Sequence, residues 1–155
     1  MADVYFADTS ALSKRYVTET GTAWLQATLD PTTACSVYIV RITAVELIAA
    51  LTRRERGGTI SPPDATAARS AFRAHLGAEY KVIEVTETLV NQAMLLAETH
   101  GLRGYDAVQL AAAMDVNASY RAAGLPTITL ICADSELNAA ALLEGLAVEN
   151  PNSHP

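Results

Sequence analysis

Short apolar runs alternate along the chain with longer segments in which apolar residues recur at helical spacing. Runs of four to eight apolar residues bounded by turn residues predict strands, whereas a repeat of three or four residues predicts helices. The predicted strands are residues 3–7, 34–39, 80–85, 127–132 and 146–149. The alternation is typical of an α/β domain with a parallel sheet.

Several predicted helices carry recognisable start signals. Ser61 followed by Pro62 combines an N-cap hydroxyl with a proline at the first helical position, and Thr86 is a similar cap. The helices are predicted to begin near Ser10, Thr43, Pro62, Glu87, Asp106 and Ser135.

Length and composition indicate one folded unit. The chain has 155 residues, of which 50% are apolar, and this suffices for a single hydrophobic core. We expect one domain over residues 1–150. Residues 151–155 include two prolines and no large apolar side chain, so we expect a disordered tail.

No uncharged apolar run reaches the roughly 18 residues of a membrane span, and no signal peptide is evident. Cys35 and Cys132 lie in apolar runs without a zinc-binding pattern, which favours free thiols. We therefore expect a cytoplasmic protein without a membrane partner. A net charge of −6 argues against a broad basic face for duplex DNA but fits a cluster of carboxylates that holds cations.

Acidic residues follow two of the predicted strands and lie in two helices. Asp8 and Asp134 each come directly after a strongly apolar strand, at the sheet edge where ligands bind in open α/β folds. Asp106 opens an alanine-rich helix, where a carboxylate interacts favourably with the helix N-terminus. Glu46 is expected at the border of an inward helical stripe, which we predict to consist of Val45, Ile48, Ala49 and Leu51.

Each of these acids has a structural interpretation when taken singly, as a helix cap or a solvated side chain. Together they predict a site, because two carboxylates about 4 Å apart repel by roughly 4 kcal/mol at an effective dielectric of 20. Oxygen ligands select Mg²⁺ or Mn²⁺, and such ions activate water for phosphate chemistry.

Four segments, "YFADTSALSKRY", "ITAVELIAALTR", "LRGYDAVQLAAA" and "LICADSELNAAALLEGL", together resemble the PIN-domain ribonucleases, and among them the VapC-like toxins of toxin–antitoxin pairs. The resemblance spans nearly the whole chain. It implies a three-layer α/β fold with a parallel five-stranded sheet in the order 3-2-1-4-5 and helices on both faces.

The resemblance also implies a catalytic site. Asp8, Glu46, Asp106 and Asp134 would bind one or two Mg²⁺ or Mn²⁺ ions and activate water for RNA hydrolysis. Asp8 and Asp106 would be the primary ligands. Asp134 would complete the site or hold a second ion, and Glu46 would act through water or handle a proton.

Neighbouring polar residues are candidates for supporting these acids. Thr9 and Ser10 match hydroxyl positions that hydrogen-bond the carboxylates, although helix capping is an equal alternative. Ala133 stands where many relatives carry a hydroxyl, so one contact is missing there. Asn138 is either a neutral ligand or a surface residue, and we favour the surface.

Basic residues near the acids in sequence are candidate contacts to RNA phosphates: Lys14, Arg15 and Arg103. The resemblance further implies a cognate antitoxin and a homodimer. Tyr16, Trp24 and Leu25 are possible partner contacts, with core packing as the alternative for Trp24.

Two other functions remain open at the level of sequence. A PIN-like interaction module without catalysis would usually lack acids that are all present here. A haloacid-dehalogenase-type phosphatase needs a second aspartate two residues after the first, where this chain has Ser10.

Overall fold

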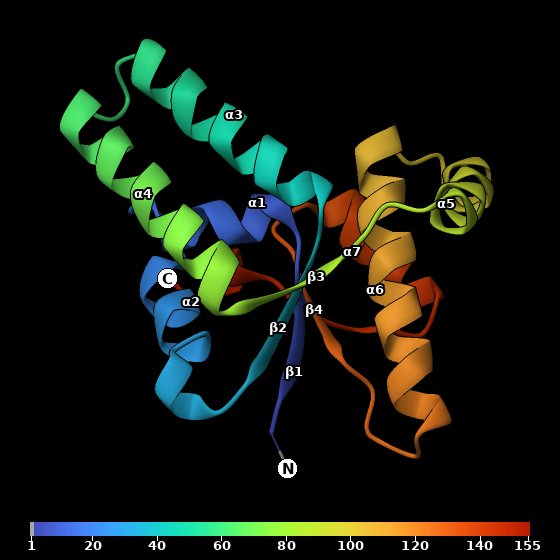
Figure 1. The fold of residues 1–155 in the computed structure, drawn as a ribbon. Helices are drawn as coiled ribbons and strands as arrows, with labels where there is room; N and C mark the ends of the chain where they lie inside the picture. The colour runs from blue at the N-terminus through green and yellow to red at the C-terminus, as the bar shows by residue number, and fades with distance from the viewer. Residues whose placement is uncertain (1) are drawn as a thin grey trace.

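The computed structural model describes residues 2–155, and its centre is a single parallel sheet of five strands (Figure 1). The strand order is β3-β2-β1-β4-β5, which confirms the predicted topology. Each observed strand overlaps its predicted range, is one to three residues shorter, and begins at most two residues later. The bounds are β1 Val4–Ala7, β2 Ser36–Val40, β3 Tyr80–Ile83, β4 Thr129–Ile131 and β5 Ala147–Glu149.

The helices agree with the predicted starts, with one division. The first predicted helix is a short α1 continued by a 3-10 turn η1, and a separate α2 follows, opened by Gly21 in the left-handed region at φ +88°. The bounds are α1 Thr9–Leu12, η1 Ser13–Arg15, α2 Thr22–Thr28, α3 Ile42–Arg56, α4 Pro62–Ala78, α5 Glu87–His100, α6 Gly104–Ala122 and α7 Ser135–Leu143. Within residues 2–155, none of the helices combines the length and apolarity that a membrane crossing requires.

The helices cover the two faces of the sheet as separate layers (Figure 1). Helices α1 to α4 enclose one core, to which β1 contributes Ala7, and α5 to α7 enclose the other, to which β1 contributes Phe6. Successive strand side chains point to opposite faces, so one strand supplies both cores. The sheet is therefore buried on both sides, as parallel sheets usually are.

The C-terminal residues pack onto α2, contrary to the expected disordered tail. They form a 3-10 turn η3, Pro151–Ser153, in which Pro151 is buried. The Trp24 ring stacks on the His154 ring with centroids 4.1 Å apart. The tail has little apolar content of its own, but the indole of Trp24 on α2 provides a surface against which it packs.

Parallel strands bring the loops that follow β1 and β4 to one edge of the sheet. The two strands are hydrogen-bonded neighbours, and the Asp8 amide donates to the Ile131 carbonyl at 3.0 Å. Helices α3 and α6 also begin at this edge (Figure 1). The ends of four elements therefore meet at one place.

Candidate active site

Asp8 and Asp134 are both helix N-caps, and each also has a carboxylate oxygen beyond its cap contact. Asp8 Oδ2 accepts from the Ser10 amide at 3.1 Å and from the Ser10 hydroxyl. Asp134 Oδ1 accepts from the Leu137 amide at 3.0 Å, while its Oδ2 accepts from Arg103. Capping and a role in the site are therefore compatible for these two residues.

Arg103 joins two of the acids. Its guanidinium donates from Nε to Asp106 Oδ2 at 3.2 Å and from Nη2 to Asp134 Oδ2 at 3.0 Å. The Arg103 side chain is 74% exposed, so this cation lies on the solvent side of the site. It links the N-termini of α6 and α7.

Glu46 faces the site, but the predicted inward stripe of α3 is wrong in part. The fully buried positions are Thr43, Leu47 and Leu51, whereas Val45 is 69% exposed. Apolar residues on α3 fit two overlapping faces, and packing against the neighbouring elements α1, α4 and β2 selects between them. Glu46 lies three residues after Thr43, so the two side chains lie on the same side of α3.

Gln109 also lies at the site, although it was not among the residues predicted from the sequence. It lies on α6, three residues after Asp106, and is 1% exposed. Its Nε2 donates to Thr43 Oγ1 at 2.9 Å, Glu46 Oε1 at 3.1 Å and Thr9 Oγ1 at 3.2 Å. A signal was present, because Gln109 is the only polar residue between positions 107 and 114.

The hydroxyls of Thr9 and Ser10 contact the acids. Thr9 Oγ1 donates to Glu46 Oε1 at 3.0 Å. Ser10 Oγ donates to Asp8 and accepts from the Ala133 amide at 3.0 Å. The backbone of Ala133 thus takes part in the contact between the two loops even though its side chain has no hydroxyl.

Residues that follow β4 lie close beneath the site. Cys132 is fully buried, and its Sγ lies 3.5 Å from Asp8 Oδ2. Asn138 is 8% exposed, so the prediction that it is a surface residue is wrong. It lies one turn after Asp134 with its side chain directed inward, and its Nδ2 donates to the Cys132 carbonyl at 2.9 Å. Among the described residues, nothing donates to Asn138 Oδ1, which is buried.

The structure places Lys14 and Arg15 with other partners. Lys14 is nearly buried, with Nζ 3.6 Å from Glu19. Arg15 donates to the Tyr80 hydroxyl at 2.7 Å and pairs with Glu79 at 2.9 Å, where β3 begins. The amino end of a parallel strand lies away from the edge that carries the acids, so of the three predicted phosphate contacts only Arg103 is beside them.

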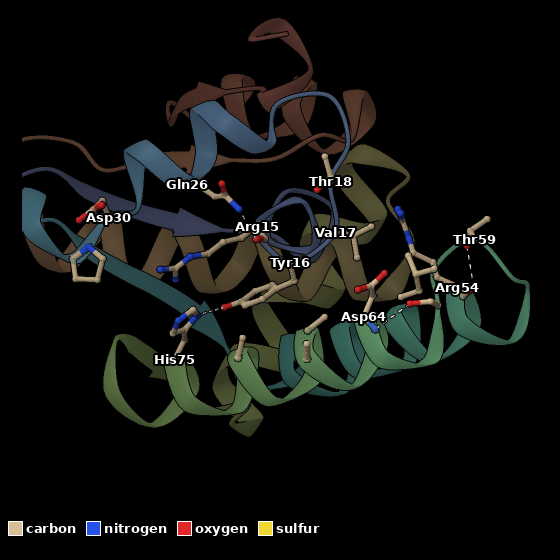
Figure 2. Close-up of a pocket in the computed structure, with 16 residues that line it drawn as sticks. Arg15, Tyr16, Val17, Thr18, Gln26, Asp30, Arg54, Thr59, Asp64 and His75 are labelled. Carbon is tan, nitrogen blue, oxygen red and sulfur yellow. Dashed lines mark hydrogen bonds between the residues drawn. The ribbon is translucent and has the colours of Figure 1, made fainter.

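A pocket with a volume of about 810 Å³ lies between α2 and α4, and we name it the α2–α4 pocket (Figure 2). None of the four acids lines it. Figure 2 shows Tyr16 directed toward His75, to which its hydroxyl is hydrogen-bonded at 2.8 Å. Of the three possible partner contacts, Tyr16 lines this pocket, Trp24 stacks on the tail and Leu25 is fully buried.

Burial, with a smaller contribution from neighbouring charges, raises the pKa of Asp8 and of Asp106. Burial raises the pKa of Asp8 to about 6; the Ser10 hydrogen bonds lower it, and the charges of Asp106 and Glu46 raise it. Burial also raises the pKa of Asp106, opposed by Arg103 and reinforced by the charge of Asp134. The site therefore holds more negative charge than Arg103 alone compensates.

The donor set suits a hard divalent cation, because it consists of carboxylate oxygens with excess negative charge. In residues 2–155 as their side chains stand, no three His, Cys, Asp or Glu residues form a group that could hold a metal ion. Arg103 bridges Asp106 Oδ2 and Asp134 Oδ2, so an ion that binds these two oxygens would replace it.

Comparisons with known proteins agree on one family. A family model described as PIN domain matches residues 5–143. Ribonuclease VapC45 of Mycobacterium tuberculosis (strain CDC 1551 / Oshkosh) is 32% identical over 146 residues, which cover 94% of this chain and 93% of that protein.

Solved structures show the same fold. PAE2754 from Pyrobaculum aerophilum has a TM-score of 0.62 and 25% identity, covering 96% of this chain and 90% of that one. A toxin–antitoxin complex from Klebsiella pneumoniae has a TM-score of 0.63 and 16% identity, with 95% and 97% covered. The five-stranded fold, the match over most of the chain and the relative that shares nearly its full length together show that this chain belongs to the PIN domain family.

Proposed function

We propose that this chain is an endoribonuclease that hydrolyses RNA phosphodiester bonds with Mg²⁺ or Mn²⁺ and acts as the toxin of a toxin–antitoxin pair in the cytoplasm. The observation that carries the proposal is the convergence of Asp8, Glu46, Asp106 and Asp134 from four elements at one sheet edge, with raised pKa values for Asp8 and Asp106. A relative of nearly the same length is named a ribonuclease, which supports the same reaction.

Asp8 and Asp106 would be the primary ligands of one ion, with Asp134 completing the site or holding a second. A bound ion of this kind supplies a water of lowered pKa and neutralises charge on the phosphate. Glu46, held on one oxygen by Thr9 and Gln109, is placed to accept a proton or bind through water. Arg103, at the solvent side, is the cation best placed to contact an RNA phosphate once released from the acids.

We propose a cognate antitoxin as partner, because a structural neighbour is a toxin–antitoxin complex. A guanidinium from the antitoxin would pair bidentately with the carboxylates. The contact that Arg103 makes with Asp106 and Asp134 supports this part of the proposal, because one guanidinium already bridges two of the carboxylates. A homodimer is a further part of the proposal.

Expression without antitoxin tests the function directly. We expect the wild-type chain to arrest growth and to produce new RNA ends that map to defined positions. Asp106→Asn should abolish both effects, whereas Asp115→Asn, an exposed position on the same helix, should leave them intact. The purified protein should cleave RNA in the presence of Mn²⁺, and a chelator should stop the cleavage.

Equal growth arrest by wild type and Asp106→Asn would contradict the mechanism. A catalytically inactive interaction module would instead show neither cleavage nor Mn²⁺ binding by calorimetry at millimolar concentrations. Titration of the wild-type chain with Mn²⁺ therefore distinguishes an active nuclease, which binds the ion, from an inactive module, which does not.

A further inference from the structure

Gln109 stands out because a polar amide is buried in an otherwise apolar stretch of α6. Its side chain is 1% exposed, and its neighbours Leu110, Ala111 and Ala112 are fully buried. An apolar residue would fill this part of the helix without burying polar atoms. The amide therefore calls for an explanation beyond packing.

The contacts of the amide are confined to one side. Nε2 has two hydrogens and lies within hydrogen-bonding distance of three oxygens, those of Thr9, Thr43 and Glu46. Oε1 is buried and accepts no hydrogen bond from the described residues. Leaving a buried acceptor unpaired is unfavourable. We therefore attribute the presence of an amide here to the hydrogen bonds that its NH₂ group donates.

The hydroxyl of Thr9 determines which way this amide points. Thr9 Oγ1 donates its hydrogen to Glu46 Oε1 at 3.0 Å, so the same oxygen has only lone pairs to offer Gln109. Glu46 Oε1 likewise only accepts when ionised. Both neighbours therefore need a donor at position 109, and a carboxylate or thioether there would not supply one.

We propose that Gln109 is a positioning residue for Glu46. It holds the carboxylate by one oxygen, together with Thr9, and through Thr43 it ties α6 to the first turn of α3. Asp106 and Gln109 lie one turn apart on α6, so one helix supplies one acid of the site and orients another. The inference rests on the proposed metal-dependent nuclease and goes beyond it by assigning a residue outside the four acids.

The test compares Gln109→Met, which keeps length and volume but removes both N–H groups, with Gln92→Met on α5 as the matched control. Calorimetry with Mn²⁺ alone should show binding weakened by about 10-fold or more in Gln109→Met and unchanged in Gln92→Met. With an RNA substrate, kcat should fall while KM stays constant, because a buried side chain does not touch RNA. A general loss of packing would instead lower the melting temperature without a selective fall in kcat at constant KM.

A double-mutant cycle identifies the residue through which Gln109 acts. In a Glu46→Ala background, Gln109→Met should weaken Mn²⁺ binding no further, since the group it positions is gone. Should Gln109→Met fail to fold, Gln109→Asn retains the amide but is one methylene too short, and the same loss is expected.

Unchanged Mn²⁺ affinity and kcat in a folded Gln109 variant would overturn the inference, as would an effect that simply adds to that of Glu46→Ala. Failure of the wild-type chain to bind Mn²⁺ or cleave RNA would instead overturn the proposed function, and this inference with it. The wild-type measurement separates the two cases.

Discussion

At the scale of single residues, the site is built from side chains that serve the fold and the proposed chemistry at once. Asp8 caps α1 through Oδ2, and Asp134 caps α7 through Oδ1 while its other oxygen contacts Arg103. Three of the acids stood out in the sequence because Asp8 and Asp134 follow strands and Asp106 opens a helix, and Glu46 joined them through the family resemblance. Gln109 did not stand out, because its partners lie up to 100 residues away in the chain.

Asp8→Asn should stabilise the metal-free protein at neutral pH. Burial raises the pKa of Asp8 to about 6 from an ordinary value of 3.8, so ionising it in the folded state costs roughly 3 kcal/mol. This penalty is absent below about pH 4 and grows as the pH rises to about 6, because the folded state then binds more protons than the unfolded state. Asparagine caps a helix as well as aspartate does.

Thermal unfolding in chelator checks this prediction. The midpoint of Asp8→Asn should exceed that of wild type by several degrees at pH 7.5, and the difference should vanish near pH 4. A variant that is less stable at pH 7.5, or that differs equally at both pH values, would contradict the pKa assignment.

Ser10→Ala should weaken metal binding more than it weakens the fold. The Ser10 hydroxyl connects Asp8 to the backbone of Ala133, and it therefore sets the distance between the loops that follow β1 and β4. We expect about a 10-fold loss of Mn²⁺ affinity by calorimetry and a loss of stability near 1 kcal/mol. Ser70→Ala, an exposed serine on α4, is the control and should change neither.

At the scale of elements, α2 and the C-terminal turn form a unit that the sequence pattern did not reveal. Gly21 opens α2 at φ +88°, and a Cβ added there would lie 2.3 Å from the Pro151 carbonyl oxygen. The tail was expected to be disordered from its own composition, but the surface it packs on belongs to Trp24. The same holds for α3, since two apolar faces were available and packing against α1, α4 and β2 decided that the face with Thr43 is buried.

Gly21→Ala should therefore destabilise the protein for two separable reasons. The left-handed backbone costs about 1 to 2 kcal/mol in any context. The clash with Pro151 adds to this only while residues 151–155 are present. Denaturant unfolding should show a larger loss in the full-length chain than in a chain ending at Asn150, and equal losses would contradict the packing of the tail.

At the scale of the whole molecule, the strand order places β1 and β4 side by side between two helical layers. Because all strands are parallel, the acids after β1 and β4 and those in α3 and α6 meet at one edge. The excess negative charge at that edge means that a bound cation should stabilise the entire fold.

Mn²⁺ should raise the melting temperature of the wild-type chain. At about 100 times its dissociation constant, a ligand that binds only the folded state adds about 2.7 kcal/mol, which corresponds to several degrees. Asp115→Asn should show the same rise, Asp8→Asn should show little or none, and EDTA should reverse it. A similar rise in Asp8→Asn would place the ion outside this site.

By itself, the sequence predicted the five strands, the helices other than α2, the parallel topology that the family resemblance implies, and four acids as candidates for one site, because these depend on local periodicity and on motifs a few residues long. Only the tertiary structure decided which face of α3 is buried, that Asn138 turns inward, that Lys14 and Arg15 pair elsewhere, and that Gln109 joins the site. Those outcomes depend on contacts between distant segments. An apolar repeat of 3.6 residues indicates that a helix has an apolar face. The neighbouring elements decide which face is buried and therefore which side chains of the helix reach the site.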